Sequence, residues 1–323
     1  MSDSITVTVP ARLHLGFFDL NGELGRKFGS IGMALSGLRT RVTVSAAMRT
    51  HIAGPDSERA RRHVARVCDA LGLHGAHRVE IAESIPGHAG LGSGTQLALA
   101  LAIALRKVHN LPLDIRGDAI RLGRGGRSGI GVGLLEGGGV VVDGGRGPEN
   151  TPAPVISRIA FPPAWRVVLV LDPTRSGVHG AEESAAMAQL STMSAVTAAQ
   201  ICRLVLMQAM PALVEADLAN FAAAISEMQA ILGRHFAPVQ GGGAFTSRPV
   251  AAALDLLESE GALGRGQSSW GPTGFTFART REQAERLVAL ARKQCRGLDI
   301  RACEGLNHGA HIAANAAAVM PHP

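Results

Sequence analysis

The chain alternates between short segments with the patterning of strands and longer segments with the patterning of helices. β-Branched residues occupy alternate positions over residues 5–15, and residues 41–46 and 79–82 follow the same rule, which is typical of half-buried strands. The uninterrupted apolar run Arg166–Leu171 predicts a strand that is buried on both faces. Further strands are predicted over residues 139–143, Gly274–Ala278 and 298–303.

Helical periodicity fills the segments between these strands. In Ser57–Leu71, apolar residues share one face and arginines occupy the other. Residues 97–108 are apolar on almost every side, which predicts a central buried helix. A helix is expected to begin after Thr280, because Thr280 and Gln283 have the spacing of a capping box. Further helices are predicted over residues 114–122, 180–232 and 249–258.

Clusters of proline and glycine over residues 144–155 mark the expected boundary between two lobes, residues 1–150 and 151–323. The second lobe has a strand–helix–helix–strand order, which favours helices on one face of a sheet. The sequence therefore predicts an α+β protein with two lobes.

Composition narrows the class of protein and of ligand. The chain has 323 residues, of which 46% are hydrophobic and 18% charged, so a globular fold is expected. The net charge of +6 suits nucleic acid, acidic lipid or a polyanionic metabolite. Because the basic residues are scattered and no aromatic residues are interleaved with them, we expect an anionic small molecule and no nucleic-acid partner.

Weaker features of the sequence bear on the cellular compartment and the oligomeric state of the protein. The four cysteines have neither C-x-x-C nor zinc spacing, which predicts reduced thiols and a cytoplasmic protein. The apolar stretch over residues 185–214 is interrupted by polar residues and by Pro211, so we expect a buried helical pair and no membrane partner. The apolar helical surface of residues 185–232 is compatible with a homodimer or with a core.

The strongest local signal is the glycine-rich segment of residues 86–96, which runs into the apolar helix. Its glycines allow the backbone to approach an anion closely, its hydroxyl groups add donors, and the helix presents its positive end to the same place. This segment therefore predicts a phosphate site. The residues expected to form it are Gly90, Gly92, Ser93, Gly94, Thr95 and Gln96.

Three motifs in order resemble those of the galactokinase, homoserine kinase and mevalonate kinase (GHMP kinase) superfamily. They are residues 10–13 (Pro-Ala-Arg-Leu), the glycine-rich segment, and residues 266–274 (Gly-Gln-Ser-Ser-Trp-Gly-Pro-Thr-Gly). The resemblance implies a two-lobed GHMP-kinase-like fold. Its N-terminal lobe would be ribosomal-S5-domain-2-like and its C-terminal lobe ferredoxin-like.

Within this superfamily, residues 12–22, 123–131, 136–138 and 141–145 resemble the β-ribofuranosylaminobenzene 5'-phosphate synthase family. The resemblance covers nearly the whole chain. It implies that phosphoribosyl pyrophosphate and 4-aminobenzoate or 4-hydroxybenzoate condense to a C-riboside 5'-phosphate, with release of CO2 and pyrophosphate. The family reaction belongs to tetrahydromethanopterin biosynthesis and uses Mg²⁺.

Two departures from the kinase pattern bear on the alternative of an ATP-dependent small-molecule kinase. The kinases commonly carry an aspartate in a Ser-Gly-x-Asp segment, and this chain has Gly131 at that position. Gly94 stands where the kinases usually have a second serine. Glycine cannot accept a proton, so the kinase is the second hypothesis. A non-catalytic sensor or nucleic-acid-binding module is the third.

Candidate site residues follow from the charges that the synthase reaction would require. Asp19 and Glu23 lie on a glycine-rich turn, where they would bind Mg²⁺ or face the ribosyl cation, or only form an ordinary turn. Glu136 is a third candidate for Mg²⁺ or for ribose hydroxyl groups. Arginines and hydroxyl groups would bind phosphate or carboxylate. Beyond the glycine-rich segment, the expected substrate-binding residues are Arg26, Arg124, Arg127, Ser128 and Arg175.

The expected catalytic residues are Asp19, His14, Arg12 and Glu183. His14 would carry a proton or bind the substituent of the arene, and a packed core histidine is the alternative. Arg12 would bind pyrophosphate or the carboxylate of the benzoate. Glu183 follows the loop that leaves the buried strand Arg166–Leu171, a common place for contacts with a ligand.

Overall fold

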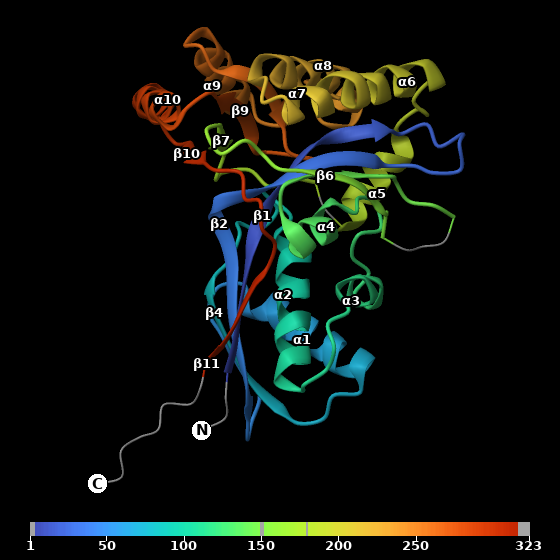
Figure 1. Ribbon diagram of the computed structural model, residues 1–323, viewed down its shortest axis with the longest axis vertical. Coiled ribbons are helices and arrows are strands. Elements are labelled where there is room, and N and C mark those ends of the chain that lie inside the picture. The colour runs from blue at the N-terminus through green and yellow to red at the C-terminus, as the bar shows by residue number, and fades with distance from the viewer. Residues whose placement is uncertain (1–3, 149–151, 179, 316–323) are drawn as a thin grey trace.

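The computed structural model describes residues 4–148, 152–178 and 180–315. Among these residues, seven strands form a first sheet in the order β11-β1-β2-β4-β3, and β5 and β6 extend it from β2 (Figure 1). The pairs are antiparallel except for β3 with β4. The strands are β1 Ser4–Asp19, β2 Gly29–Ala47, β3 His51–Ala53, β4 Ala76–Glu83, β5 Val140–Asp143, β6 Val155–Ile159 and β11 His311–Asn315.

A long hairpin of β1 and β2 connects the two hydrophobic cores of the molecule. Val7 and Val9 pack with the helices beside the first sheet, whereas Leu13 and Leu15 pack with the helices of the second lobe. Register shifts after Pro10 and His14 interrupt the pairing, and such bulges increase the local twist. The hairpin therefore turns between the two cores, with the even-numbered residues of β1 on the opposite face.

Four helices accompany the first sheet: α1 Ser57–Leu71, α2 Ser93–Val108, α3 Ile115–Arg121 and α4 Ile130–Gly137. The bounds predicted for α1 are confirmed, and α2 begins four residues earlier than predicted, inside the glycine-rich segment. The helix α4 was not predicted, because glycines lower helix propensity. It forms because the absence of side chains allows close packing: a Cβ on Gly133 would lie 2.6 Å from Val155.

The second sheet is antiparallel, with the order β10-β7-β9-β8. Its strands are β7 Arg166–Leu171, β8 Leu263–Gln267, β9 Gly274–Ala278 and β10 Asp299–Cys303. Numbered within the lobe, this order is 4-1-3-2 with helices after the first and third strands, which is the ferredoxin-like arrangement. The helical segments are α5 Gly180–Gln189, α6 Ala195–Leu204, η1 Val205–Ala209, α7 Met210–Val214, α8 Leu218–Phe236, η2 Ala237–Val239, α9 Arg248–Ser259 and α10 Arg281–Gln294.

The α+β class and the two-lobed architecture are confirmed, but the expected boundary between residues 150 and 151 needs correction. Residues 149–151 lie outside the described residues. The strand β6 still pairs with β5, and β11 returns to pair with β1. The first sheet thus extends beyond the expected boundary as far as Ile159, and it includes a strand from the far end of the described chain. The local sequence pattern does not predict that strands so far apart in the chain will pair.

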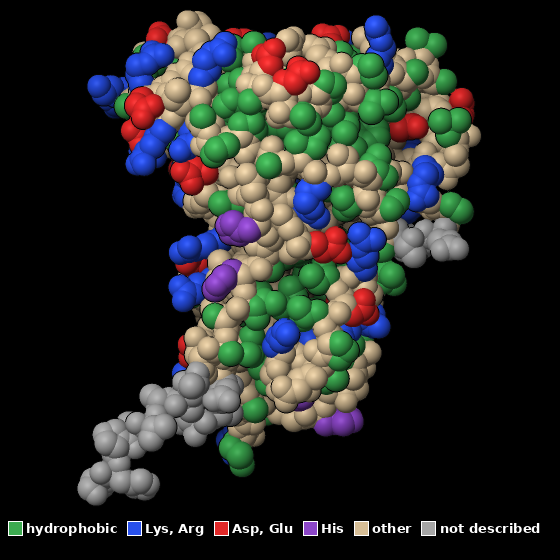
Figure 2. Space-filling model, viewed as in Figure 1, with side chains coloured by type: hydrophobic (Ala, Val, Ile, Leu, Met, Phe, Trp, Pro, Cys, Tyr) green, Lys and Arg blue, Asp and Glu red, His purple; other side chains and the backbone are tan. Residues whose placement is uncertain are grey.

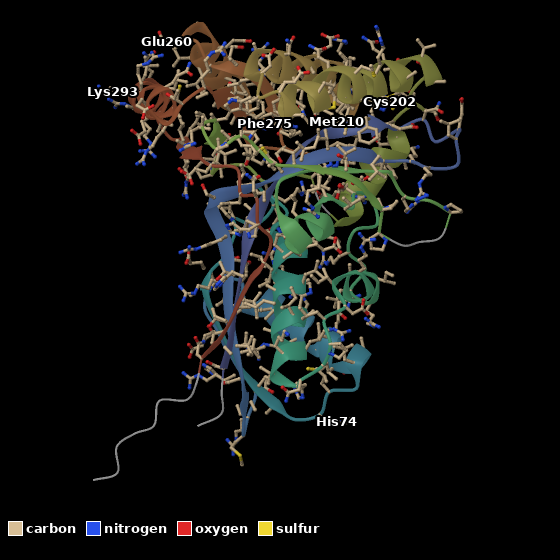
Figure 3. All side chains as sticks on the ribbon, viewed as in Figure 1. His74, Cys202, Met210, Glu260, Phe275 and Lys293 are labelled. Atoms are coloured by element: carbon tan, nitrogen blue, oxygen red, sulfur yellow. The ribbon has the colours of Figure 1, made fainter. Side chains whose placement is uncertain are left out.

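The second lobe packs on the upper part of the β1–β2 hairpin. Figure 3 shows side chains, Phe275 and Met210 among them, at the level where the helices meet the first sheet. The run from α6 to α7 buries Ile201 and Val205 here but leaves Val196 and Met207 79% and 68% exposed. The expectation of a buried helical pair therefore holds for the inner face of these helices and is wrong for the outer face, which is exposed. Figure 2 shows hydrophobic side chains gathering over the helices of this lobe.

The segment Ala195–Val214 is also apolar and long enough to cross a membrane by length and composition. A third of its most apolar window is buried within the protein. One such helix is also a common feature of a protein core.

Candidate active site

Three hollows meet where the two lobes face each other. The anion hollow, about 380 Å³, is lined by the glycine-rich segment and by arginines. The central hollow, about 470 Å³, is lined by residues 123–128 and by the start of α5. The small hollow, about 30 Å³, lies among aromatic side chains. Ser269 lines all three, so the hollows form one continuous site.

The three sequence motifs come together around Ser268. Its hydroxyl group donates to the carbonyl of Gly90 at 2.7 Å and accepts from the backbone N–H of His14 at 3.0 Å. Gly90 has φ +75°, and a Cβ there would lie 2.3 Å from the carbonyl oxygen of Ser268. Glycine is therefore required at this close approach of two backbones. The backbone of Arg12 also donates to the carbonyl of Leu91 at 3.1 Å.

The N-terminus of α2 opens into the anion hollow. Gly92 precedes the helix in a left-handed conformation, and no side chain caps the first turn within the described residues. Ser93, Gly94 and Thr95 of this turn all line the hollow. The uncapped N–H groups and the positive end of the helix dipole favour an anion.

Three arginines from different elements line the same hollow: Arg12 on β1, Arg59 on α1 and Arg124 after α3. Arg12 donates to the carbonyl of Gly90 at 3.3 Å, and Arg59 donates to Ser93 Oγ at 3.4 Å. The Nε atom of each arginine is buried and has no hydrogen-bond partner among the described residues. Because buried donors are nearly always satisfied, this set of donors indicates a site that binds an anion.

Burial and mutual repulsion act on these cations. Burial lowers the pKa of Arg12 to about 10, and the Glu183 carboxylate opposes this shift. Burial, Arg66 and Arg59 lower the pKa of Arg124. His63 lies beside Arg124, with an Nε2···Nη2 distance of 3.4 Å. Burial and the surrounding arginines, Arg124 first, lower the pKa of His63 to about 4. At neutral pH, His63 is therefore uncharged while the arginines stay protonated.

The central hollow depends on a buried aspartate that shapes its glycine-rich loop. Asp143 accepts hydrogen bonds from Gly129 N at 2.8 Å, Ser30 Oγ at 2.6 Å and Ser128 Oγ at 3.3 Å. Burial raises the pKa of Asp143, and these hydrogen bonds oppose the rise. The loop is thus held so that Arg124, Arg127 and Ser128 line the hollow.

Glu183 is the sole carboxylate among the described residues that line the two large hollows. It lies on α5 and forms an ion pair with Arg127. The expected candidates Arg12, His14, Glu183, Arg124, Arg127 and Ser128 therefore come together at the central hollow.

His14 lies between the central and the small hollow. Its side chain is buried, and its ring centroid lies 4.4 Å from that of Phe17. Burial and the positive charge of Arg12 lower the pKa of His14 well below its usual value. Its Nε2 atom has no hydrogen-bond partner among the described residues, so this site contains a neutral imidazole with an unused polar atom.

The expected Mg²⁺ ligands do not gather into one cluster. Asp19 accepts from the backbone N–H groups of Asn21 and Gly22 at 2.8 and 3.1 Å, which is ordinary turn chemistry. Glu23 accepts from the Asn21 amide at 3.1 Å, and Glu136 pairs with Arg116 at 3.0 Å. Among the described residues, no three His, Cys, Asp or Glu side chains are placed to hold a metal ion.

Three expected substrate-binding residues also lie outside the hollows. Arg26 donates to the carbonyl of Gly144 at 2.9 Å, and Arg175 donates to that of Thr246 at 3.0 Å. Gln96 is fully buried and donates to the carbonyl of Pro10 at 3.0 Å. Gln96 thus joins α2 to β1, which corrects its expected role in binding phosphate.

Sequence reasoning missed Arg59, His63 and Arg146, which lie at or beside the hollows. Arg59 and His63 are four residues apart on α1, where His63 belongs to the buried stripe of the helix and Arg59 is partly buried beside it. Their spacing on one side of the helix, next to the apolar stripe, was the available signal. Arg146 lies among glycines after β5, a composition that resembles the neighbouring run at 123–128.

Comparison with known proteins places the fold. The N-terminal domain model of the GHMP kinases matches residues 58–134, and the C-terminal model matches residues 209–297. Homoserine kinase from Cytophaga hutchinsonii superposes with a TM-score of 0.63 and 17% identity, covering 97% of this chain and 98% of the kinase. Mevalonate diphosphate decarboxylase from Staphylococcus aureus gives a TM-score of 0.66 and 15% identity, covering 97% and 98% of the two chains.

Relatives identified by sequence indicate a narrower family than the fold does. A protein from Archaeoglobus fulgidus named beta-ribofuranosylphenol 5'-phosphate synthase is 33% identical over 84% of this chain and 87% of its own length. Proteins of the same name from Methanocaldococcus jannaschii and Methanothermobacter thermautotrophicus are 32% and 30% identical, each over 84% of this chain and 88% of the relative. The expected resemblance is confirmed, and the chain belongs to the beta-ribofuranosylphenol 5'-phosphate synthase family, built on the GHMP kinase fold.

Proposed function

We propose that this protein is a decarboxylating pentosyltransferase that joins phosphoribosyl pyrophosphate to 4-hydroxybenzoate. Family membership supports the reaction, and the relatives' name, which specifies a phenol, favours the hydroxybenzoate over 4-aminobenzoate. The observation that carries the proposal is the anion hollow. Here three partly buried arginines, whose buried Nε atoms have no hydrogen-bond partner among the described residues, surround an uncapped helix N-terminus.

In this proposal the diphosphate group of the substrate binds in the anion hollow. Arg12, Arg59 and Arg124 would donate to its oxygens, and the first turn of α2 would add backbone N–H groups. Negative charge accumulates on the diphosphate as its bond to the ribose breaks. Donors already fixed at that position stabilise this charge without reorganising.

The ribose and its 5'-phosphate would occupy the central hollow. Arg127 and Arg146 line it and would balance the phosphate charge. Glu183 lines both hollows, so its carboxylate is placed to offset positive charge that develops on the ribosyl group. The reaction requires no nucleophilic side chain, since the ring carbon of the acceptor forms the new bond.

A kinase role fits this site less well. Gly131 lies in α4, where a Cβ would contact Thr95 at 3.3 Å, and it provides no carboxylate. Glu183 is the remaining carboxylate of the two large hollows among the described residues, and it is paired with Arg127. A phosphoryl acceptor would therefore lack a free base at the position that the kinase pattern assigns to one.

Mg²⁺ would bind at this site together with the diphosphate group of the substrate. Mg²⁺ is commonly held by one or two carboxylates together with phosphate oxygens and water. Glu183 is the carboxylate that lines the hollows, and it would contact Mg²⁺ in exchange for its ion pair with Arg127. When bound, Mg²⁺ would offset charge on the leaving diphosphate. A cytoplasmic location and a homodimer remain parts of the proposal.

The test is to incubate the pure protein with phosphoribosyl pyrophosphate, Mg²⁺ and each benzoate, measuring released CO2 and the aryl riboside phosphate. Formation of both products supports the proposal. If neither acid yields either product, while Mg-ATP binds and is converted to ADP with an alcohol, the kinase alternative is correct.

A further inference from the structure

The small hollow is a separate part of the site with its own chemistry. It opens toward the central hollow past His14, Phe17 and Ser269, which line both. Its volume of about 30 Å³ exceeds the roughly 10–15 Å³ that a water molecule requires but is too small for a benzene ring. It can therefore receive one small substituent while the ring lies outside, toward the central hollow.

The walls of the small hollow suit the edge of an aromatic ring. Phe236 and Trp270 lie on one side with ring centroids 5.0 Å apart, and Phe17 packs against His14 at 4.4 Å. These tilted arrangements are typical of favourable aromatic contacts. A planar acceptor that enters between these walls directs its far substituent into the hollow.

Gln267 supplies a donor in a fixed orientation. Its Oε1 accepts from the backbone N–H of Thr246 at 2.7 Å and from the Thr246 hydroxyl at 2.9 Å. These two bonds fix which end of the amide is oxygen. Its Nε2 makes only long contacts, 3.5 Å to Gln240 Oε1 and 3.4 Å to the carbonyl of Ser269, at the outer limit of hydrogen bonding. This N–H group is available to a ligand.

We propose that the small hollow binds the para hydroxyl group of the aromatic acceptor, with Gln267 Nε2 donating to its oxygen and His14 Nε2 accepting its hydrogen. The proposal rests on the proposed function and names the residues that determine its acceptor specificity. A hydroxyl group can accept from one partner and donate to the other. An arylamine is a donor and a poor acceptor, so Gln267 would lose its partner if 4-aminobenzoate were bound.

The same contact assists the chemistry at the opposite end of the ring. The bond between the ribose carbon and diphosphate breaks, and its electron pair leaves with diphosphate. Ring electrons form the new carbon–carbon bond from the carbon that carries the carboxylate, and the para oxygen shares the resulting positive charge. CO2 then leaves, and its bonding electrons restore the aromatic ring. A hydrogen bond from the hydroxyl group to the neutral His14 stabilises the charged stage.

The first experiment uses the unmodified protein with phosphoribosyl pyrophosphate and Mg²⁺. We expect kcat/KM for 4-hydroxybenzoate to exceed that for 4-aminobenzoate by at least tenfold, because a site built to bind a hydroxyl group discriminates against ligands that cannot satisfy it. Benzoate and 4-methoxybenzoate are tested as competitive inhibitors. Both should bind at least tenfold more weakly than 4-hydroxybenzoate, benzoate for lack of the hydroxyl group and 4-methoxybenzoate for its size.

The second experiment uses Gln267→Glu, which keeps an acceptor for Thr246 and removes the amide donor. We expect the preference for the hydroxy over the amino acid to fall at least tenfold, while binding of diphosphate stays within twofold. Gln200→Glu, on the exposed face of α6, is the matched control and should leave the preference unchanged.

The outcomes separate the two proposals. If the unmodified protein makes product but benzoate or 4-methoxybenzoate binds as tightly as 4-hydroxybenzoate, the small hollow does not bind the substituent. An unchanged preference in a folded Gln267→Glu variant also refutes it. If no product forms with either acid, the proposed function itself fails.

Discussion

Replacing Arg59 by methionine tests the anion hollow at a residue that lies far in sequence from the glycine-rich segment. The side chain of Arg59 is 17% exposed, bonds to Asp56 at 2.7 Å and reaches Ser93 at the start of α2. Methionine keeps much of the length of the side chain but removes the positive charge and the donors. Asp56 keeps a second partner in Ser84, so the loop before α1 should stay in place.

The expected magnitude follows from the lost contact with phosphate. A hydrogen bond to a charged group contributes about 1.5–3 kcal/mol. Since each 1.4 kcal/mol corresponds to about tenfold in affinity, the Kd for diphosphate should rise by roughly 10- to 100-fold. KM for phosphoribosyl pyrophosphate should rise similarly, and the stability of the protein should change little.

Isothermal titration with diphosphate measures the affinity, and steady-state kinetics measures KM. Arg61→Met is the matched control, because Arg61 is exposed on the same helix and its substitution removes the same charge without opening the hollow. Equal diphosphate affinities for the two variants would refute the assignment of Arg59 to the anion site. If both variants bind diphosphate more weakly than the unmodified protein at low salt, and this difference disappears at high salt, the two arginines act only through long-range attraction.

Three further predictions concern stability, pH and assembly. Gly90→Ala should lower the free energy of unfolding by about 2–4 kcal/mol, because the cost of a left-handed backbone adds to the cost of overpacking. Gly123 has open space around it, so Gly123→Ala should lower the free energy of unfolding by only about 1 kcal/mol. Urea unfolding measures both changes. The pKa of His63 in the folded protein is about 4, which is lower than in the unfolded chain. The free energy of unfolding should therefore fall as the pH decreases from about 6.5 toward 4. His63→Asn should reduce this fall, which is measured from the midpoints of urea unfolding at each pH. If the exposed apolar face of α6 to α7 forms the expected homodimer, Met207→Glu should shift sedimentation toward the monomer, and an unchanged profile would exclude this face.

The sequence predicted those elements whose signals are local. The bounds of α1, β7 and β9 follow from periodicity and burial, and Thr280 caps α10 through Gln283 N at 3.2 Å as expected. The first half of β2 was missed, because residues 29–35 are buried on both faces and residues 36–38 form a bulge opposite Pro10 and Ala11. Alternation is lost where both faces are buried.

The candidate site was predicted where glycine or motif chemistry marks it, and missed where tertiary packing creates it. Ser93, Arg12 and His14 belong to motifs and lie at the hollows. Arg59 approaches Ser93 only because α1 packs beside α2, and a helix face gives no sign of its neighbour. Asp19 failed to reach the hollows, because its turn lies at the tip of the β1–β2 hairpin.

The pairing of β11 with β1 has a consequence for how the protein is made. The ribosome synthesises β1 before the other described elements, yet β11, one of its two neighbours in the sheet, emerges only after all of them. Until then one edge of β1 has no partner, and an open strand edge can pair with another chain. During translation, this open edge of β1 must therefore be kept from pairing with other chains. Chains that terminate before His311 should aggregate.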